Sequence, residues 1–155
     1  AIAITPSEGD VDDIVRYVKH ALAAGAQAVQ LRSPQLASQE LWQLVDQLIA
    51  GHISVSALVL NSMWLPDSAA MTAARSRGMQ SLHVRPRDIK SISSYLSFFT
   101  HLYCACHSKD ELKIAQSVGA CAVLLSPVQS TQTHPQQAPL GWQAFTEWVE
   151  HCNLP

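Results

Sequence analysis

The sequence predicts an α/β fold with a parallel sheet, because short apolar runs alternate with helical patterns along all 155 residues. Hydrophobic residues make up 48% of the chain and charged residues 14%, which provides enough apolar material for a packed core. About six strand–helix units follow one another, whereas an eight-unit TIM-type β/α barrel typically needs about 250 residues. The chain therefore falls about two units short of such a barrel.

The predicted elements alternate from one end of the chain to the other. The predicted strands cover residues 1–5, 26–32, 55–61, 79–84, 102–106 and 120–125. The predicted helices cover residues 10–24, 38–50, 67–77, 89–99, 109–118 and 142–152.

The first two helices show the clearest signals. Acidic residues open the helix at 10–24 and Gly25 follows its end, as the helix dipole and the usual stop signals favour. In the helix at 38–50, apolar residues recur at i, i+3, i+4 and i+7 and so share one face: Leu41, Leu44, Val45 and Leu48. Gly51 is predicted to close this second helix.

The middle units are bounded by turn and capping residues. Gly78 is predicted to stop the helix at 67–77, and another helix is predicted over 89–99. In the fifth unit, the spacing of Ser108 and Glu111 is that of a capping box, in which each side chain accepts a hydrogen bond from the other residue's backbone. This signal predicts a helix that runs to Val118.

The sixth unit is predicted to end in a long polar loop and a closing helix. The loop runs from the strand at 120–125 to Pro139. The helix at 142–152 carries large apolar residues that are predicted to pack in the core: Trp142, Phe145, Trp148 and Val149.

Composition excludes several classes of function. Ten Lys and Arg against twelve Asp and Glu leave a net charge of −2, so the chain has no basic excess with which to bind nucleic acid. Its apolar runs are too short to cross a membrane. The four cysteines form no CxxC pair, which favours buried, reduced thiols over zinc ligands or disulfides. These features predict a cytoplasmic protein that binds neither nucleic acid nor membranes.

Polar residues recur where the predicted strands end, which is where parallel α/β folds gather their chemistry. The positions are Thr5, Gln30 with Arg32, Asn61, His83 with Arg85, His107, and the segment 126–133. Arg32 and Arg85 are the residue type that binds an anionic, phosphorylated ligand. The alternative interpretation is that these residues are polar only because they lie beside loops.

Several segments in this order resemble the thiamine phosphate synthase/TenI family across the whole chain. They are Val29-Gln30-Leu31-Arg32, Leu60-Asn61, Ala105-Cys106-His107, the loop from Leu124 to Pro135, and Pro139 to Phe145. The closest likeness is to the TenI-like domains that follow a Nudix hydrolase in some bacteria. The resemblance implies an incomplete TIM-type β/α barrel with about six of the eight βα units. It forms a single domain over residues 1–155 that lacks the last two units, and with them the family's loops that hold the thiazole phosphate.

The resemblance assigns one set of residues to the pyrimidine half of the substrate. The family's barrel enzymes use magnesium to join a pyrimidine diphosphate to a thiazole phosphate, with release of pyrophosphate. Gln30 and Arg32 match the family's Gln-x-Arg-x-Lys signature, which grips the diphosphate, but Pro34 stands in place of the lysine. Asn61 matches the first residue of the family's Asn-Asp pair, and Ser62 replaces the magnesium-binding aspartate.

The resemblance also assigns residues to the later units. Asp88 matches the family's second magnesium aspartate, although it also suits the first turn of a helix. His107 matches the central histidine after the fifth strand. Thr131 and Thr133 match a threonine pair that contacts substrate. Pro127 occupies the position of the catalytic histidine of the aromatising TenI branch, so the resemblance assigns no catalytic acid or base.

Two functions remain open from the sequence. The retained Gln, Arg, Asn and Thr residues favour a protein of thiamine biosynthesis or salvage that binds a thiamine-related phosphorylated ligand, with impaired transferase activity. The missing Lys and Asp favour a non-catalytic binding or regulatory remnant. The chain could also be a piece of a longer protein. Because six strands cannot close as eight do, we expect a homo-oligomer or a partner chain to cover the open barrel edge.

Overall fold

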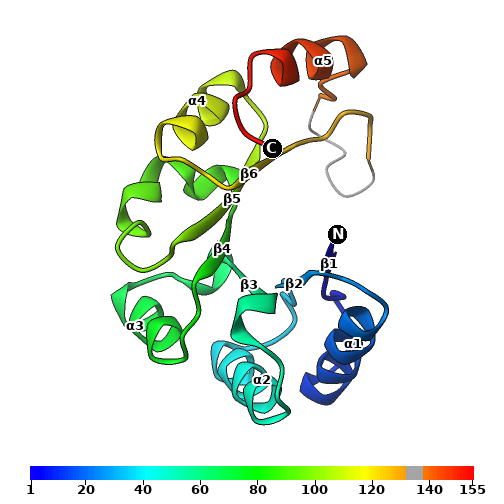
Figure 1. Ribbon diagram of the computed structural model, residues 1–155, viewed down its shortest axis with the longest axis vertical. Coiled ribbons are helices and arrows are strands. Elements are labelled where there is room, and N and C mark those ends of the chain that lie inside the picture. The colour runs from blue at the N-terminus through cyan, green and yellow to red at the C-terminus, as the bar shows by residue number, and fades with distance from the viewer. Residues whose placement is uncertain (132–137) are drawn as a thin grey trace. The chain divides into compact units, whose positions relative to one another are not determined.

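The computed structural model describes residues 1–131 and 138–155 and divides the chain into two compact units, residues 1–82 and 83–155. Strands and helices alternate along the chain in both units (Figure 1). The six strands follow one another in the sheet in chain order, and each residue register that the structure gives is parallel. The predicted α/β class is confirmed.

The first unit contains three strand–helix repeats. Its elements are β1 (Ile2–Ile4), α1 (Val11–Ala23), β2 (Ala28–Leu31), α2 (Ser38–Ala50), β3 (Leu58–Asn61) and α3 (Ser68–Ser76). Strand β2 pairs with β1 on one side and with β3 on the other, and every residue of β2 and β3 is buried. Continuous burial is typical of parallel strands that are covered on both faces.

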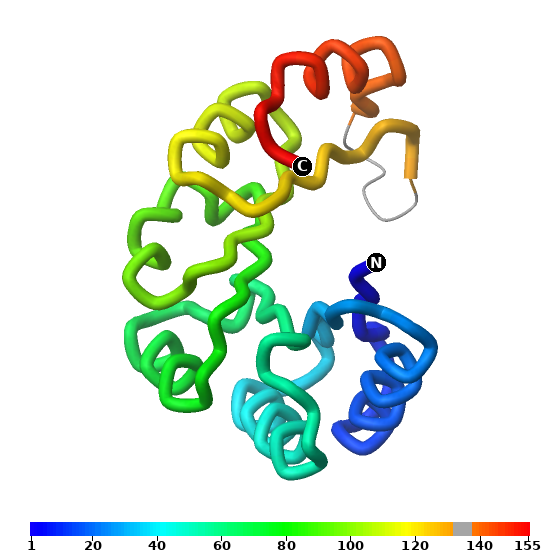
Figure 2. The backbone as a smooth tube through the Cα atoms, in the orientation of Figure 1, coloured from blue at the N-terminus to red at the C-terminus, as the bar shows by residue number. Residues whose placement is uncertain are grey.

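Strand β4 (Ser81–Val84) crosses the boundary between the two units. The other elements of the second unit are a 3₁₀-helix (Pro86–Ser94), β5 (His101–Cys106), α4 (Lys109–Ser117), β6 (Ala122–Leu125) and α5 (Trp142–Glu150). The last residue, Pro155, lies beside β6 (Figure 2). Its carbonyl accepts a 2.8 Å hydrogen bond from the Val123 N–H.

The helices begin and end close to where the sequence predicts. Helix α2 has the predicted bounds, and its apolar face (Leu41, Leu44, Val45 and Leu48) is at most 1% exposed. Asp10 and Asp67 cap α1 and α3. The capping box of Ser108 and Glu111 at the start of α4 is also confirmed.

Gly51 caps the end of α2, as predicted. It has an ordinary φ of −81°, and the left-handed residue is the next one, His52, with φ at 62°. In that conformation the His52 N–H donates to the Ile49 carbonyl at 3.0 Å and the Ile53 N–H to the Leu48 carbonyl at 3.0 Å. These bonds satisfy the last carbonyls of the helix, at the cost of a strained backbone for a residue with a Cβ.

Two predictions are corrected. The segment predicted as a helix over 89–99 is a 3₁₀-helix that begins earlier, at Pro86, whose fixed φ suits a first helical position. In α5, Trp148 is buried, but Trp142 and Val149 are 62% and 47% exposed. The helical spacing identified an apolar stripe correctly, but only part of this stripe packs in the core.

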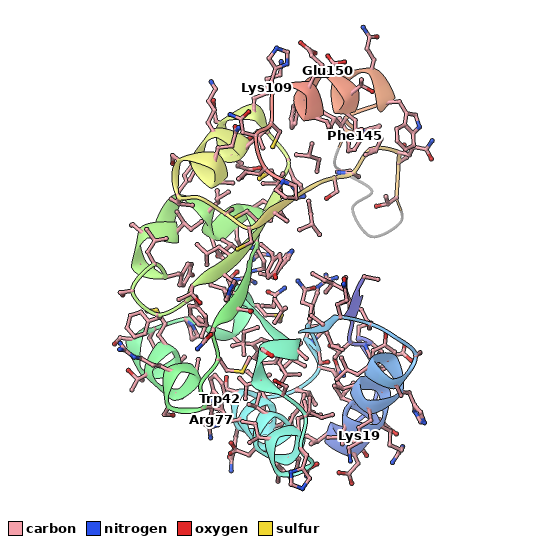
Figure 3. All side chains as sticks on the ribbon, viewed as in Figure 1. Lys19, Trp42, Arg77, Lys109, Phe145 and Glu150 are labelled. Atoms are coloured by element: carbon pink, nitrogen blue, oxygen red, sulfur yellow. The ribbon has the colours of Figure 1, made fainter. Side chains whose placement is uncertain are left out.

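Polar contacts join neighbouring helices within each unit. In the first, Arg77 donates two hydrogen bonds to Asp46, at 2.7 and 2.9 Å, and its guanidinium lies 5.1 Å from the centre of the Trp42 ring (Figure 3). The hydrogen bond from Arg77 lowers the pKa of Asp46, against the small effect of burial. In the second unit, Lys109 of α4 lies 3.4 Å from Glu147 of α5.

All four cysteines are free thiols, as predicted. Cys104 and Cys106 are completely buried in β5, as predicted. Cys121 and Cys152 are partly exposed, so the prediction that all four thiols are buried is wrong for these two. Among the described residues, no helix combines the length and apolar character that a membrane span requires.

Candidate functional site

Thr5 anchors the end of the first two strands. Its N–H donates to the Gln30 carbonyl at 3.0 Å, and its Oγ1 accepts a 2.8 Å hydrogen bond from the Arg32 N–H. The Ser33 hydroxyl lies 2.9 Å from Thr5 Oγ1 and 3.2 Å from the Pro6 carbonyl. Thr5 and Ser33 are at most 4% exposed, so this network fixes the backbone from which the Arg32 side chain leaves.

Gln30 and Arg32 differ sharply in environment. Gln30 is 4% exposed, whereas Arg32 is exposed. Among the described residues, every fully buried side-chain nitrogen or oxygen has a hydrogen-bond partner. The pair therefore offers an amide and a guanidinium at the end of one strand.

Asn61 lies at the end of the neighbouring strand, where it has a structural task. Its Oδ1 accepts a 3.0 Å hydrogen bond from the Met63 N–H and so caps the 3₁₀ turn Ser62–Trp64. Trp64 is buried, and its indole N–H donates to the Leu31 carbonyl at 3.1 Å. Because β2 and β3 are paired, Gln30, Arg32 and Asn61 lie at adjacent strand ends within the first unit.

In the second unit, Asp88 lies in the first turn of the 3₁₀-helix and pairs with Arg85, whose Nε lies 2.6 Å from the carboxylate. Tyr95 is buried in the same region. Burial raises the pKa of the Tyr95 hydroxyl, the negative charge of Asp88 raises it further, and Arg85 opposes both. Asp88 thus belongs to a local network of an arginine and a tyrosine.

This network does not fit a magnesium site made by the protein alone. Magnesium is bound by several oxygen ligands in octahedral geometry. Among the described residues, no three His, Cys, Asp or Glu side chains are grouped so that they could hold a metal ion. The assignment of magnesium to Asp88 stays a prediction.

His107 is placed between β5 and α4. Its N–H donates to Glu111 Oε2 at 2.6 Å, and the Ser108 N–H donates to the same oxygen at 3.1 Å. The capping box therefore fixes the His107 backbone at the strand end. Strand β6 pairs with β5, with Cys106 opposite Leu125, so the segment that follows β6 begins beside His107.

An open pocket of about 510 Å³ follows β6. Its lining residues are Leu125, Ser126, Pro127, Val128, Gln129, Ser130, Thr131 and Trp142. Thr131, one of the predicted site residues, is exposed in this lining. Thr133, its predicted companion, lies outside the described residues.

Two residues of this arrangement are not among the site residues that the sequence predicts. The sequence identifies Thr5 only as a polar strand end, although its hydroxyl fixes the Arg32 backbone. The helical spacing predicts Trp142 in the core, but Trp142 lines the pocket and is exposed. Its position at the first turn of a helix directly after a long polar loop was the available signal, since such loops often border binding sites.

Comparisons with known proteins find matches over the whole chain. Residues 1–155 match the family described as thiamine monophosphate synthase. The chain is similar to the protein named Putative thiamine-phosphate synthase 2 of Aquifex aeolicus (strain VF5), with 27% identity over 154 residues that make up 99% of this chain and 80% of that protein.

Solved structures show the same fold. The thiamine phosphate pyrophosphorylase of Pyrococcus furiosus matches 99% of this chain and 71% of its own, with a TM-score of 0.68 and 17% identity. The thiamine phosphate pyrophosphorylase of Bacteroides thetaiotaomicron matches 97% of this chain and 65% of its own, with a TM-score of 0.58 and 16% identity. The predicted TIM-type α/β class is thus confirmed at the level of the fold.

Proposed function

The chain belongs to the thiamine monophosphate synthase family, and on that premise we propose that it binds a thiamine-related phosphorylated ligand with little synthase activity. The observation that carries the proposal is the exposed guanidinium of Arg32, on a backbone that Thr5 fixes, at the strand end that also carries Gln30. A guanidinium gains a charge-assisted hydrogen bond when a phosphate oxygen arrives.

The proposed ligand residues form one group in each unit. In the first unit, Gln30, Arg32 and Asn61 would contact a diphosphate or phosphate group, with Arg32 supplying the charge. In the second unit, His107, Thr131 and Thr133 would supply hydrogen bonds to a ligand.

Loss of synthase activity follows from two residue replacements. Pro34 lacks the ammonium group with which a lysine would bind the leaving pyrophosphate. Ser62 lacks the carboxylate with which an aspartate would bind magnesium. Preorganised positive charge on a leaving group is a main source of rate enhancement in such reactions. We propose that Mg²⁺ enters this protein only together with ligand phosphates, because Asp88 is engaged with Arg85.

The test is calorimetric titration with thiamine phosphate, with thiazole phosphate, and with pyrophosphate in the presence of Mg²⁺. We expect micromolar binding that weakens about tenfold in Arg32→Ala, since a charge-assisted hydrogen bond contributes about 1.5–3 kcal/mol. Arg16→Ala is the matched control, because Arg16 is an exposed arginine of α1 that pairs with Asp13. Equal weakening in both variants, or no binding to any ligand, contradicts the proposal.

A non-catalytic regulatory role is the second candidate. Pro34 and Ser62 favour it, and so does the use of the Asn61 side chain as a turn cap. A coupling assay separates the two: release of pyrophosphate from the pyrimidine diphosphate and thiazole phosphate indicates a synthase, and tight binding without release indicates the regulatory role.

We further propose that a second copy of the chain or a partner chain covers the strand edges, and that the protein acts in the cytoplasm. The exposed apolar residues of β1, Ile2 and Ile4, and Leu124 of β6 support the first point, because exposed apolar residues on an edge strand favour association. The four free thiols support the second.

A further inference from the structure

Helices α4 and α5 lie side by side in the second unit (Figure 1), and a groove of about 240 Å³ lies between them. Its lining residues include none of the ligand residues proposed above, so the groove is a separate feature of the molecule. A cavity of about 150 Å³ is large enough for a benzene molecule. The groove therefore has room for a larger ring or a short chain.

Helix α4 contributes one continuous stripe to the groove. Its lining residues are spaced i, i+3, i+4 and i+7 and so share one face of the helix: Lys109, Leu112, Lys113 and Gln116. Leu112 is buried, whereas the side chains of Lys109 and Lys113 are both more than half exposed. This wall therefore combines an apolar contact at its base with two ammonium groups at its rim.

Helix α5 forms the opposite wall, in which the buried Trp148 adds a second apolar side chain to the base. The His151 ring donates from Nδ1 to the Glu147 carbonyl at 2.7 Å, since a carbonyl oxygen can only accept, and this bond holds the ring against its own helix. The Gln116 amide donates to the His151 carbonyl at 3.4 Å, and the Lys109 ammonium lies 3.4 Å from the Glu147 carboxylate. One polar contact thus bridges the two helices at each end of the groove.

The two lysines are accessible to a bound anion. Lys109 lies 3.4 Å from Glu147 and Lys113 lies 3.5 Å from Asp110, and all four side chains are more than half exposed. Exposed ion pairs of this kind contribute little to stability, because water competes for both charges. Two ammonium groups and one carboxylate in the lining leave one net positive charge, so the groove attracts a ligand with a negative charge.

We propose that the groove between α4 and α5 binds a small organic carboxylate, whose apolar body lies on Leu112 and Trp148 while its carboxylate binds Lys109 and Lys113. The apolar base favours such a ligand over inorganic phosphate, which would gain nothing from it, and the charged rim favours it over a neutral apolar molecule. This inference goes beyond the proposed function, since it concerns a second site with a ligand of another chemical class.

The experiment measures binding of two probes to the whole chain by calorimetry. The first probe is 2-naphthoate, an apolar ring system with one carboxylate, and the second is 2-naphthalenemethanol, its neutral counterpart. We expect 2-naphthoate to bind with a Kd on the order of 0.1 mM, as a small ligand in a half-open groove would. The alcohol should bind about tenfold more weakly, because it forms no charge-assisted hydrogen bond with the lysines.

Three variants test the charges of the rim. The double variant Lys109→Met with Lys113→Met keeps most of each apolar stem and should bind 2-naphthoate about tenfold more weakly. Lys90→Met is the matched control, because Lys90 is an exposed lysine of the same unit outside the groove, and its affinity should equal that of the wild type. Glu147→Gln should bind about threefold more tightly, since it removes the carboxylate that competes for Lys109. General damage to the fold would not produce tighter binding.

Nuclear magnetic resonance locates the bound probe through the indole N–H signals of the four tryptophans. The signal of Trp148, identified by its loss in Trp148→Phe, should shift with 2-naphthoate, and those of Trp42, Trp64 and Trp142 should stay in place. The inference is overturned if 2-naphthoate does not bind, if the alcohol binds equally well, if the double methionine variant keeps its affinity, or if Trp142 shifts instead of Trp148. Titration with thiamine phosphate decides the proposed function separately, because the two sites share no residue.

Discussion

Among single residues, Thr5 links the strand framework to the candidate ligand residues. Its buried hydroxyl accepts the Arg32 N–H and contacts the Ser33 hydroxyl, so the arginine backbone is held before any ligand arrives. The sequence placed Arg32 at the end of a strand correctly. It could not place this bond, because residues 5 and 32 meet only through the pairing of β1 with β2.

We predict that Thr5→Val destabilises the protein by about 1–3 kcal/mol, because it removes the buried oxygen that accepts hydrogen bonds from the Arg32 N–H and the Ser33 hydroxyl, at almost unchanged side-chain volume. Ligand affinity should fall as well, since the Arg32 backbone is no longer fixed. Urea unfolding and calorimetry measure the two effects. Thr5→Ser keeps the hydroxyl, so its stability and ligand affinity should stay near those of the wild type. An equal loss of stability in both variants would show that the methyl group of Thr5 matters instead.

The buried thiols of β5 predict a loss of stability in alkaline solution. Burial raises the pKa of Cys104 to about 11 and that of Cys106 to about 12, from an ordinary value of 9.0. The unfolded chain therefore releases these protons first. Stability should be unaffected below about pH 9 and should fall as the pH rises from there toward 11–12.

Urea midpoints measured under reducing conditions across this alkaline range test the effect. The double variant Cys104→Ala with Cys106→Ala is the control, and its stability should depend less steeply on pH. An identical slope in the variant and the wild type would assign the effect to other groups, such as Tyr95, whose pKa burial also raises.

Among the elements, α2 shows how accurately a sequence can define a helix. Four apolar residues at helical spacing gave its buried face and its bounds. Helix α5 shows the limit of the same reasoning: the spacing finds an apolar stripe, but whether a neighbour covers it depends on the tertiary fold. Trp142 and Val149 are therefore exposed although they share the pattern of core residues.

The end of α2 supplies a prediction at the level of the element. His52 has a left-handed backbone that costs a side-chain-bearing residue about 1–2 kcal/mol, whereas glycine adopts it freely. After subtraction of the greater entropy that glycine loses on folding, His52→Gly should stabilise the protein by about 0.5–1 kcal/mol. Thermal unfolding provides the measurement.

Gly25 offers the reciprocal change after α1. Its φ is 96°, and an added Cβ would meet nothing within 4 Å, so Gly25→Ala changes only the backbone preference. We expect it to destabilise the protein by about 1 kcal/mol. If His52→Gly also destabilises, the imidazole makes a contribution that exceeds the backbone strain.

For the whole molecule, the prediction of a single domain over residues 1–155 can be tested by unfolding. The chain forms two compact units, 1–82 and 83–155, and β4 crosses their boundary. Because a strand is shared, we expect one cooperative transition that is the same by fluorescence and by circular dichroism. Two separated transitions would show that each unit folds as a domain of its own.

Association of chains is the second prediction at this scale. We expect sedimentation to show a dimer or larger assembly, and Ile4→Glu on the exposed face of β1 to shift it toward the monomer by placing a charge in an apolar contact. Tyr17→Glu, at an exposed position of α1, is the control and should leave the assembly intact. A wild-type monomer at high concentration would contradict the proposal.

The distribution of the thiols has a practical consequence. All four cysteines lie beyond residue 82, so the first unit contains none. A thiol-specific reagent added to the native protein therefore modifies only the second unit, first at the partly exposed Cys121 and Cys152 and later, when the structure opens locally, at Cys104 and Cys106. The order and rate of labelling, read by mass spectrometry with and without ligand, would report the local opening of one half of the chain without any engineered probe.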